Sequence, residues 1–422
     1  MKILLLGGGG REHALAWKLS QSPECDQLWI APGNGGTSHC GENVDVAVDD
    51  FATIGDFVLT NGVNTVVVGP EDPLVNGIRD YFAGHESLQD VHLIGPSKEA
   101  AQLEGSKAYA KAFMEAFNIP TAASRTFDAS TVEEGVKWLS QQTPPYVLKA
   151  DGLASGKGVL VLDDLATAQQ ELRNMIQEKK FGEASQRVIV EEHMSGREFS
   201  VFALTDGLSW KILPVAKDYK RIGEKGTGAN TGGMGAVSPV PFVAKSLLDK
   251  VKSNILQPTI DGLQQRGLHY QGFLYLGLME VDEEPYVVEY NIRLGDPEAQ
   301  VVLLRLKSDL LPLLTSMKEG RLAEQTISYE PNAAASVVLA SEGYPGKYEK
   351  GKVISGLDDV QDSYIFHAGT EKDDDGQLVT SGGRVLSVNS LSTDILSAAK
   401  QSIANADKIQ YEGEYFRRDI GH

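Results

Sequence analysis

The chain has 422 residues, of which 41% are apolar and 23% are charged, and its formal net charge at pH 7 is −19. This composition is typical of a soluble globular protein with about two to four domains, and the negative charge argues against a general affinity for nucleic acids or anionic membranes. The two cysteines lack metal-ligand spacing and indicate a cytoplasmic protein. No apolar run reaches the roughly 18 residues that a membrane span needs.

Residues 1 to about 100 predict alternating strands and helices. Short apolar segments at 3–6, 28–31, 65–68 and 91–94 each run into a turn rich in glycine or proline, and the first is followed by a helix over 11–20. This pattern is typical of a parallel sheet covered by helices, in which ligands bind at the carboxyl ends of the strands. We therefore predict an α/β fold that begins with a parallel-sheet domain.

A run of four glycines, Gly7 to Gly10, follows the first strand. It does not fit a dinucleotide-binding fingerprint, because Glu12 stands where the third glycine is required and no acid follows the second strand. A phosphate at the start of the following helix still fits, since helix N-termini favour anions. Arg11 and the amides of Asn34 and Gly35 are candidates for the same phosphate.

The segment VLKADGLASGKGVLV, residues 147–161, predicts two antiparallel strands joined by a glycine-rich turn. It is not a Walker loop, because only three residues separate Gly152 from Gly156 and Gly158 replaces the metal-binding hydroxyl. A turn of this kind after Lys149 can fold over a nucleotide and offer N–H groups to phosphate oxygens. The alternative is an ordinary hairpin with a flexible turn.

Several further elements follow in chain order. We expect a helix over 108–117, hairpins at 199–204 with 210–215 and at 272–281 with 286–293, a turn at the acidic run 373–376, and a last helix near 392–406. We also predict a long glycine-rich loop over residues 219–239, YKRIGEKGTGANTGGMGAVSP. Loops of this length in compact domains are usually functional.

The segment VVEYNIR, residues 287–293, carries the most informative side chains. If it is a strand, Glu289, Asn291 and Arg293 share one face, while Val288 and Tyr290 face the core. A carboxylate, a carboxamide and a guanidinium are costly to bury together without a ligand. Hard oxygen ligands of this kind suit Mg²⁺ that bridges substrate phosphates. The alternative is a surface salt bridge between Glu289 and a lysine.

Taken together, these motifs resemble those of the ATP-grasp enzymes, which share the strand ending in Lys149, its glycine turn, VIVEEHMSGREFS from Val188 and the Glu-x-Asn-x-Arg strand. The resemblance narrows to the phosphoribosylamine–glycine ligase family from residue 2 to residue 421. The segments that carry it are GGGGREHALAWKLSQSP, APGNGGT, GPEDPLVNGI, GPSKEAAQLEGSKAYAKAFM, LKADGLASGKGV, DYKRIGEKGTGANTGGMGAVSP, EYNIRLGDPEAQ, SGGRVLSV and RRDIG.

This resemblance implies three domains. They are a biotin-carboxylase-N-like parallel domain over 1–101, an ATP-grasp domain over 102–329 with a lid subdomain at about 121–192, and a small C-terminal α+β domain over 330–422. It also implies a reaction in which ATP, glycine and 5-phosphoribosylamine give glycinamide ribonucleotide, ADP and phosphate through glycyl phosphate, with Mg²⁺ or Mn²⁺. We expect a cytoplasmic monomer or weak dimer that binds neither nucleic acid nor membrane.

The resemblance also implies roles for individual residues. The residues expected to bind ATP are Lys107, Lys149, Gly152, Gly156, Gly158, Glu191, Glu192 and Glu198. The residues expected to bind the metal are Glu289 and Asn291. The residues expected to bind the other substrates are Gly9, Arg11, Asn34, Gly35, Asp218, Lys220, Gly233, Arg293 and Asp296. Arg293 is expected to meet the transferring phosphoryl group, and Lys149 to assist it.

Three neighbours of these motifs depart from the family pattern, namely Tyr219, Leu294 and Tyr290. They affect the expected positioning of substrate and not the reaction. Glu280 is either a second metal ligand or a residue that faces solvent at the end of a hairpin. The alternatives to the implied function are another ATP-grasp carboxylate–amine ligase of nucleotide metabolism, a nucleotide sensor without catalysis, and a nicotinamide oxidoreductase.

Overall fold

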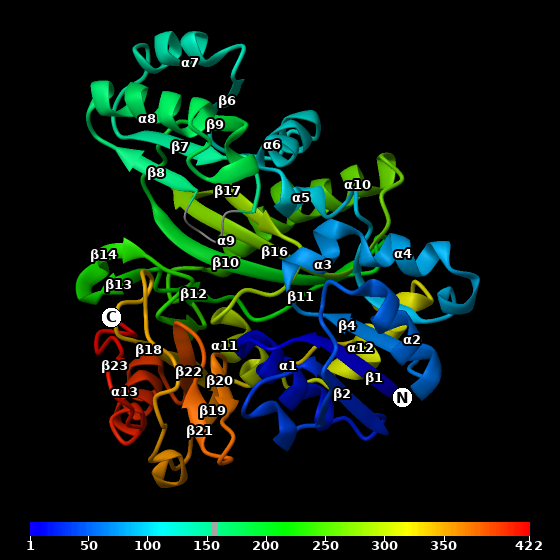
Figure 1. Ribbon diagram of the computed structural model, residues 1–422. Coiled ribbons are helices and arrows are strands. Elements are labelled where there is room, and N and C mark those ends of the chain that lie inside the picture. Colours follow the sequence, from blue (N-terminus) through cyan, green and yellow to red (C-terminus); the bar gives the residue numbers. More distant parts are fainter. Residues whose placement is uncertain (154–157) are drawn as a thin grey trace.

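The computed structural model describes residues 1–153 and 158–422 (Figure 1). Within these ranges, no helix is both long and apolar enough to cross a membrane. The architecture is α/β, with a parallel sheet at the N-terminal end, a central antiparallel region, a separate small sheet and a C-terminal sheet backed by a helix. The predicted fold class is therefore confirmed.

The first hundred residues form the predicted parallel sheet, in the order β5–β4–β1–β2–β3. Its elements are β1 (Lys2–Gly7), α1 (Gly10–Ser20), β2 (Gln27–Pro32), β3 (Glu42–Asn43), α2 (Phe51–Asn61), β4 (Thr65–Val68), α3 (Glu71–Asn76), α4 (Ile78–Gly84) and β5 (His92–Pro96). The apolar strands are buried almost completely, which is why they read as continuous hydrophobic runs. The run of glycines lies at the carboxyl end of β1, between this strand and α1.

The central region continues the same sheet with antiparallel strands. β16 pairs with β5 through Tyr270 with Pro96 and Gln271 with Gly95, so β11, β10, β16 and β17 extend the parallel strands into one sheet of nine. The elements are α5 (Gln102–Gly105), α6 (Lys107–Ala116), β10 (Arg197–Thr205), β11 (Trp210–Ile212), α9 (Lys245–Val251), α10 (Gln257–Gln265), β16 (Tyr270–Val281), β17 (Glu284–Asn291), α11 (Glu298–Arg305) and α12 (Leu310–Lys318). Both predicted hairpins are present.

A separate four-stranded antiparallel sheet, in the order β6–β9–β7–β8, stands above β16 and β17 in Figure 1. It contains β6 (Ser124–Asp128), α7 (Val132–Leu139), β7 (Tyr146–Ala150), β8 (Val159–Leu162), α8 (Leu165–Gln177) and β9 (Arg187–Glu191). The two helices pack on the sheet and enclose a hydrophobic cluster of their own. This subdomain therefore has a hydrophobic core separate from that of the central strands.

The C-terminal residues supply four strands of a six-stranded sheet, whose other two strands are residues 217–218 and 235–238. They also form a separate two-stranded sheet and one long helix. The elements are β18 (Ala333–Ser341), β19 (Tyr364–His367), β20 (Thr370–Lys372), β21 (Leu378–Thr380), β22 (Arg384–Ser392), α13 (Ile395–Ala406) and β23 (Glu414–Tyr415). The acidic run 373–376 turns between β20 and β21 and the last helix is present, as the sequence predicts. The helix α13 packs on β18 and β22.

The prediction of a long loop over 219–239 is wrong, because this segment contains three strands. β13 (Arg221–Gly223) and β14 (Thr227–Asn230) form a hairpin, and β15 (Gly235–Ser238) pairs with both β12 (Lys217–Asp218) and β18. Glycines at 226, 228 and 233 adopt positive φ and provide the turns, while the buried GAVS segment completes the C-terminal sheet. The central region and the C-terminal sheet are therefore interlocked.

Candidate functional site

Glu289 and Asn291 lie two residues apart on one face of β17. Glu289 stands opposite Gly277 of β16, where a Cβ would lie 3.0 Å from Glu289 Cγ, so the glycine leaves room for the acid. The amide of Asn291 has Nδ2 toward Glu104 Oε1 at 3.0 Å, since the opposite orientation would set oxygen against oxygen. The pair therefore presents a carboxylate and a carboxamide oxygen, both suited to a hard cation.

Two details of the predicted strand are wrong. β17 ends at Asn291, so Arg293 lies beyond the strand and does not share its face by alternation. A bulge opposite Leu278 also shifts the alternation, so that Val287 is fully buried and Val288, which was predicted to face the core, is only half-buried. A bulge inserts one extra residue into the strand and so reverses which side chains point inward.

Arg293 is nevertheless held close to Asn291 by two carboxylates. Its Nη2 lies 2.6 Å from Glu104 Oε1 and its Nε lies 3.1 Å from Glu71 Oε2. Burial raises the pKa of Glu104 to about 7, although Arg293 opposes this shift. Glu104 also accepts a hydrogen bond from the Ile292 amide at 2.8 Å. One buried acid therefore orients both the predicted metal ligand Asn291 and the predicted phosphoryl contact Arg293.

Three lysines gather below the small antiparallel sheet. Lys149 Nζ lies 2.6 Å and Lys111 Nζ lies 3.2 Å from the buried carboxylate of Glu191. Lys107 Nζ donates to the Gly152 carbonyl at 3.1 Å. Burial lowers the pKa of Lys107, and the negative charge of Glu289 opposes that effect. The lysines of α6 and β7 therefore face the same space as the acid of β17.

The predicted phosphate turn is only partly within the described residues. Gly156 lies outside them. Gly152 adopts φ +156, and a Cβ there would lie 2.9 Å from Ala184 Cβ, so a larger residue would collide with the neighbouring turn. The Gly158 carbonyl accepts a hydrogen bond from the Ala150 amide at 2.8 Å and closes the hairpin. The described part of the turn is thus a strand connection, as predicted.

The expected adenine hinge follows directly after β9. The backbone of Glu191 is paired within the sheet with Ser124 and Val147, and the Glu192 amide donates to the Ala123 carbonyl at 2.9 Å. These groups are therefore occupied by the fold, and the side chain of Glu191 binds lysine. A hinge contact with adenine stays a prediction, for the Glu192 carbonyl and the residues that follow it.

A small cavity connects the expected ribose, metal and glycine residues. Lys220 Nζ lies 2.5 Å from Asp218 Oδ1 and 3.4 Å from Glu198 Oε2. The cavity is lined by Glu198, Phe199, Ser200, Asp218, Lys220, Tyr275, Gly277, Leu278, Val288 and Glu289. Residues that are far apart in the chain, and that the sequence assigns to three different ligands, therefore surround one space.

Glu298 lies beside this cavity and is 4% exposed. Its Oε1 accepts a hydrogen bond from Ser200 Oγ at 3.4 Å. Burial and the nearby charge of Asp218 raise the pKa of Glu298 to about 7, and Lys220 opposes the shift. Two acids and one lysine thus form a compact charged group, which suits a ligand that carries both an ammonium and a carboxylate.

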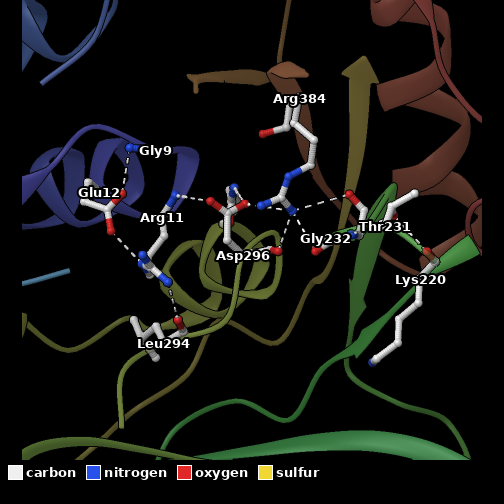
Figure 2. Close-up of polar contacts among 12 residues, drawn as sticks. Gly9, Arg11, Glu12, Lys220, Thr231, Gly232, Leu294, Asp296 and Arg384 are labelled. Atoms are coloured by element: carbon white, nitrogen blue, oxygen red, sulfur yellow. Dashed lines mark hydrogen bonds and ion pairs between the residues drawn. The ribbon is translucent and has the colours of Figure 1, made fainter. Parts of the chain in front are cut away.

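Asp296 joins all three parts of the chain (Figure 2). Its Oδ2 accepts a hydrogen bond from the Arg11 amide at 3.1 Å, and its carbonyl accepts one from Arg384 Nη1 at 2.6 Å. Arg384 also donates to the Gly232 carbonyl at 2.7 Å. Burial disfavours the charged form of Asp296, but Arg384 and Arg11 outweigh it and lower its pKa. The proline that follows Asp296 also requires a glycine at position 233. Gly233 has φ +118, and a Cβ there would lie 2.4 Å from Pro297 Cδ.

The predicted anion site at the start of α1 is already filled by a side chain of the helix itself. Glu12 accepts hydrogen bonds from the Gly9 amide at 2.7 Å and from Arg11 Nε at 2.6 Å (Figure 2). Arg11 is only 8% exposed and also donates to the Leu294 carbonyl at 3.1 Å. Arg11 therefore lies at the expected place, bound to protein acceptors, and its contact with a substrate phosphate stays a prediction.

Asn34 and Gly35 connect two domains. The Asn34 side chain donates to the carbonyls of Gly8 and His367, at 2.9 and 2.8 Å, and the Gly35 amide donates to the Thr370 carbonyl at 3.0 Å. The Asn34 amide donates to Thr37 Oγ1 at 2.8 Å. Of the two amides that we expected to hold a phosphate, that of Gly35 instead binds the C-terminal domain and that of Asn34 binds Thr37 in its own loop. Their assignment to phosphate remains a prediction that this arrangement does not favour.

Comparison with known proteins now bears on what this site does. Three family profiles match the chain in order: the N domain of phosphoribosylglycinamide synthetase over residues 1–104, its ATP-grasp (A) domain over 105–299 and its C domain over 334–422. The chain belongs to the phosphoribosylglycinamide synthetase family.

Relatives and solved structures agree with this membership. The chain is 46% identical to the phosphoribosylamine–glycine ligase of Allochromatium vinosum and 42% identical to that of Caldanaerobacter subterraneus, and covers 98% and 99% of these proteins with its full length. The structure of the Thermotoga maritima phosphoribosylamine–glycine ligase is similar at TM-score 0.85 and 35% identity, over 99% of this chain and all of that one. A biotin carboxylase from Campylobacter jejuni shares the fold at TM-score 0.73 and 13% identity, over 100% of this chain and 94% of that one.

Glu280 is neither solvated nor placed beside the predicted metal ligands Glu289 and Asn291. Its Oε2 lies 2.7 Å from Arg197 Nε, its Oε1 accepts from the Glu283 amide at 3.1 Å, and it is 8% exposed. Glu280 pairs with Pro285 at the far end of the β16–β17 hairpin, whereas Gly277 occupies the position opposite Glu289. The expectation that Glu280 faces solvent is therefore wrong, because Arg197 covers it.

Several residues of the candidate site were not found from the sequence. They share one property, namely that they contact the predicted site residues from segments remote in the chain: Glu71, Glu104, Lys111, Glu298 and Arg384. Glu104, Glu298 and Arg384 lie inside the motifs LEGSK, DPEAQ and SGGRV. Charged residues within otherwise apolar or glycine-rich motifs were the signal that could have identified them.

Proposed function

We propose that this chain uses ATP to join glycine to 5-phosphoribosylamine, with glycyl phosphate as intermediate. A carboxylate oxygen of glycine attacks the γ-phosphorus of ATP, and the bond from this phosphorus to the ADP oxygen breaks. The amine nitrogen of 5-phosphoribosylamine then attacks the acyl carbon, loses a proton and displaces phosphate. Both steps depend on positioning and on neutralising negative charge.

The observation that carries this proposal is the shared space of the lysines and the acid of β17. Lys107 begins α6 and reaches the Gly152 carbonyl that follows β7, the strand of Lys149. The negative charge of Glu289 raises the pKa of Lys107 against the effect of burial. Lysines suit the phosphates of ATP, because their ammonium groups carry the opposite charge. Glu198, at the rim of the cavity, is in place for the ribose of the nucleotide. This arrangement supports an ATP site between the small sheet and the central strands.

We assign Mg²⁺ or Mn²⁺ to Glu289 and Asn291. Within the described ranges, no group of three or more His, Cys, Asp or Glu side chains could hold a metal ion without a further ligand. A pair of protein oxygens that is completed by substrate phosphates is the usual way in which enzymes bind Mg²⁺. A metal bound there would neutralise the charge that develops on the phosphates.

Glycine and 5-phosphoribosylamine occupy the space between the three domains. Asp218 and Lys220 bind the charged ends of glycine, supported by Glu298 in the same group. Asp296 is placed for the ribosylamine, next to Arg11 and the glycine run. Arg293 shares the carboxylate of Glu104 with Asn291, and its guanidinium is suited to the transferring phosphoryl group.

The test is release of phosphate with ATP, glycine and freshly prepared 5-phosphoribosylamine, in which each substrate is omitted in turn. We expect full turnover only with all three. Glycine labelled with ¹⁸O in its carboxylate should transfer one label to the released phosphate. Turnover with another amine or another amino acid, in place of these two, would favour a different ATP-grasp ligase.

We further infer that the protein acts in the cytoplasm as a monomer or weak dimer, without nucleic acid or membrane. The two free cysteines and the net charge of −19 support this. Sedimentation at several protein concentrations measures the oligomeric state, and a stable tetramer would contradict it.

A further inference from the structure

The β13–β14 hairpin, residues 221–230, lies directly after the glycine-binding pair Asp218 and Lys220. Its residues are mostly exposed, and it turns through positive φ at Lys225, Gly226 and Gly228. Because the hairpin buries little apolar surface, its position depends on polar contacts with neighbouring segments.

Residues 415–422 supply such contacts. Four hydrogen bonds join them to the hairpin: Tyr415 Oη to the Ile222 carbonyl at 2.9 Å, Arg417 Nη1 to the Arg221 carbonyl at 3.0 Å, the Lys225 amide to Asp419 Oδ2 at 2.6 Å, and the Arg418 amide to Glu224 Oε1 at 3.3 Å. Arg417 is 3% exposed and is itself held by Asp419 at 2.7 Å. The guanidinium of Arg417 is therefore a fixed support and not a solvated side chain.

Tyr219 connects this support to the substrate-binding pair. Its hydroxyl accepts a hydrogen bond from the Gly421 amide at 2.9 Å and donates to the His422 carbonyl at 3.2 Å. Its ring lies between two cations, 5.1 Å from Lys217 Nζ and 5.2 Å from the guanidinium carbon of Arg417. A phenylalanine at this position would keep the ring and lose both hydrogen bonds. The departure of this residue from the family pattern is thus matched by a partner in residues 415–422.

We propose that Tyr219 and Arg417 are positioning residues for the ligase reaction. Through residues 415–422 they hold the backbone that carries Asp218 and Lys220, and this part of the inference rests on the proposed function. Lys220 is useful only while its ammonium stays within reach of both Asp218 and Glu198, at 2.5 and 3.4 Å. Misplacement of a binding group by about 1 Å is enough to reduce catalysis strongly.

The experiment compares Tyr219→Phe and Arg417→Lys with the wild type. Each variant should raise the Michaelis constant for glycine by about two- to tenfold, as expected for the loss of one or two hydrogen bonds, and leave that for ATP within about twofold. The double variant should raise it by less than the product of the single effects, because both residues support the same backbone. Tyr411→Phe is the matched control, since this buried hydroxyl donates to the Ala340 carbonyl at 3.0 Å in the same domain and does not contact the hairpin.

Amide hydrogen exchange over residues 219–230 provides a readout that does not need turnover. Exchange should be faster in Tyr219→Phe and Arg417→Lys than in wild type and unchanged in Tyr411→Phe. If the exchange is faster in the two variants but the wild-type protein has no ligase activity, the proposed function is contradicted and the support of the hairpin is not. Unchanged exchange, or an equal rise of the constants for all three substrates, would overturn the positioning role.

Discussion

The orientation of one amide shows how a single buried acid orders the proposed metal site. Glu104 accepts from Asn291 Nδ2, and this turns the carboxamide oxygen away from the acid, where it can serve as a ligand. The same carboxylate binds Arg293. Residues that orient ligands in this way usually matter nearly as much as the ligands themselves.

Glu289→Gln should remove the charged metal ligand while it keeps the shape of the side chain. We expect kcat to fall by about 100-fold or more at saturating Mg²⁺, as is typical when a main electrostatic contact is lost. Steady-state kinetics and circular dichroism measure activity and fold. Glu284→Gln, at the other end of β17, is the matched control and should retain activity, because Glu284 is exposed and pairs only with Lys250 among the ion pairs of the described residues. A near wild-type rate for Glu289→Gln would refute the assignment.

Glu104→Gln should act on the same site without touching the metal. The neutral amide has one acceptor oxygen in place of two, so it cannot neutralise Arg293 and cannot accept from both Asn291 and the Ile292 amide without moving a partner. We therefore expect Arg293 and Asn291 to be misplaced. We expect activity or apparent Mg²⁺ affinity to fall by about 10- to 100-fold. Titration with Mg²⁺ checks this, and a loss of thermal stability with unchanged Mg²⁺ dependence would show a structural role only.

At the scale of elements, β22 reaches from the C-terminal sheet into the substrate region. Arg384 at its start donates to carbonyls on both sides of the cavity region, those of Gly232 and Asp296. These acceptors follow β14 and β17, which belong to different sheets. One side chain therefore sets the distance between the glycine-rich turn and the Asp-Pro turn.

Arg384→Ala should loosen this contact. Loss of hydrogen bonds to a charged group costs about 1.5–3 kcal/mol, which corresponds to roughly a 10- to 150-fold change. We expect the Michaelis constant for glycine or 5-phosphoribosylamine to rise within this range, while that for ATP stays close to wild type. Arg305→Ala removes another arginine that binds the Asn332 carbonyl and Ser238 Oγ, away from the site, and should leave all three constants unchanged. Equal behaviour of the two variants would contradict a role of β22 in substrate binding.

At the scale of the whole molecule, two buried histidines mark the contact of the N- and C-terminal domains. The His367 amide donates to His13 Nδ1 at 2.8 Å. Burial lowers the pKa of His13 to about 3, with further effects of His367 and His39, and burial lowers that of His367 to about 4. Both side chains are thus neutral in the folded protein across the physiological range.

Folding stability should therefore decrease as the pH falls from about 6.5 towards 4. In this window the unfolded chain protonates these histidines and the folded protein does not, so acid favours unfolding. As the pH falls from 7 to 5, each histidine should lower the free energy of unfolding by about 2 kcal/mol. Urea unfolding measures this free energy at each pH. Its decrease from pH 7 to pH 5 should be smaller in His367→Gln than in the wild type by about 2 kcal/mol. Identical pH slopes in the two proteins would contradict this.

The sequence by itself determined the local features of this protein. Short apolar strands followed by glycine turns specify the first sheet, and alternation along the chain places Glu289 and Asn291 on one face, because neighbours in the chain carry this information. Even here, one bulge reversed the faces of Val287 and Val288, since the pairing with β16 decides where a strand takes up an extra residue.

Only the tertiary structure decided which partners these residues meet. Glu104 contacts Arg293 from 189 positions away, and Arg384 contacts Gly232 from 152 positions away. Asn34 and Gly35 bind the C-terminal domain, although their glycine-rich setting suggested a phosphate. The physical reason is that a buried polar group must find a hydrogen-bond partner, and in a folded chain the partner in reach is set by packing and not by distance along the sequence.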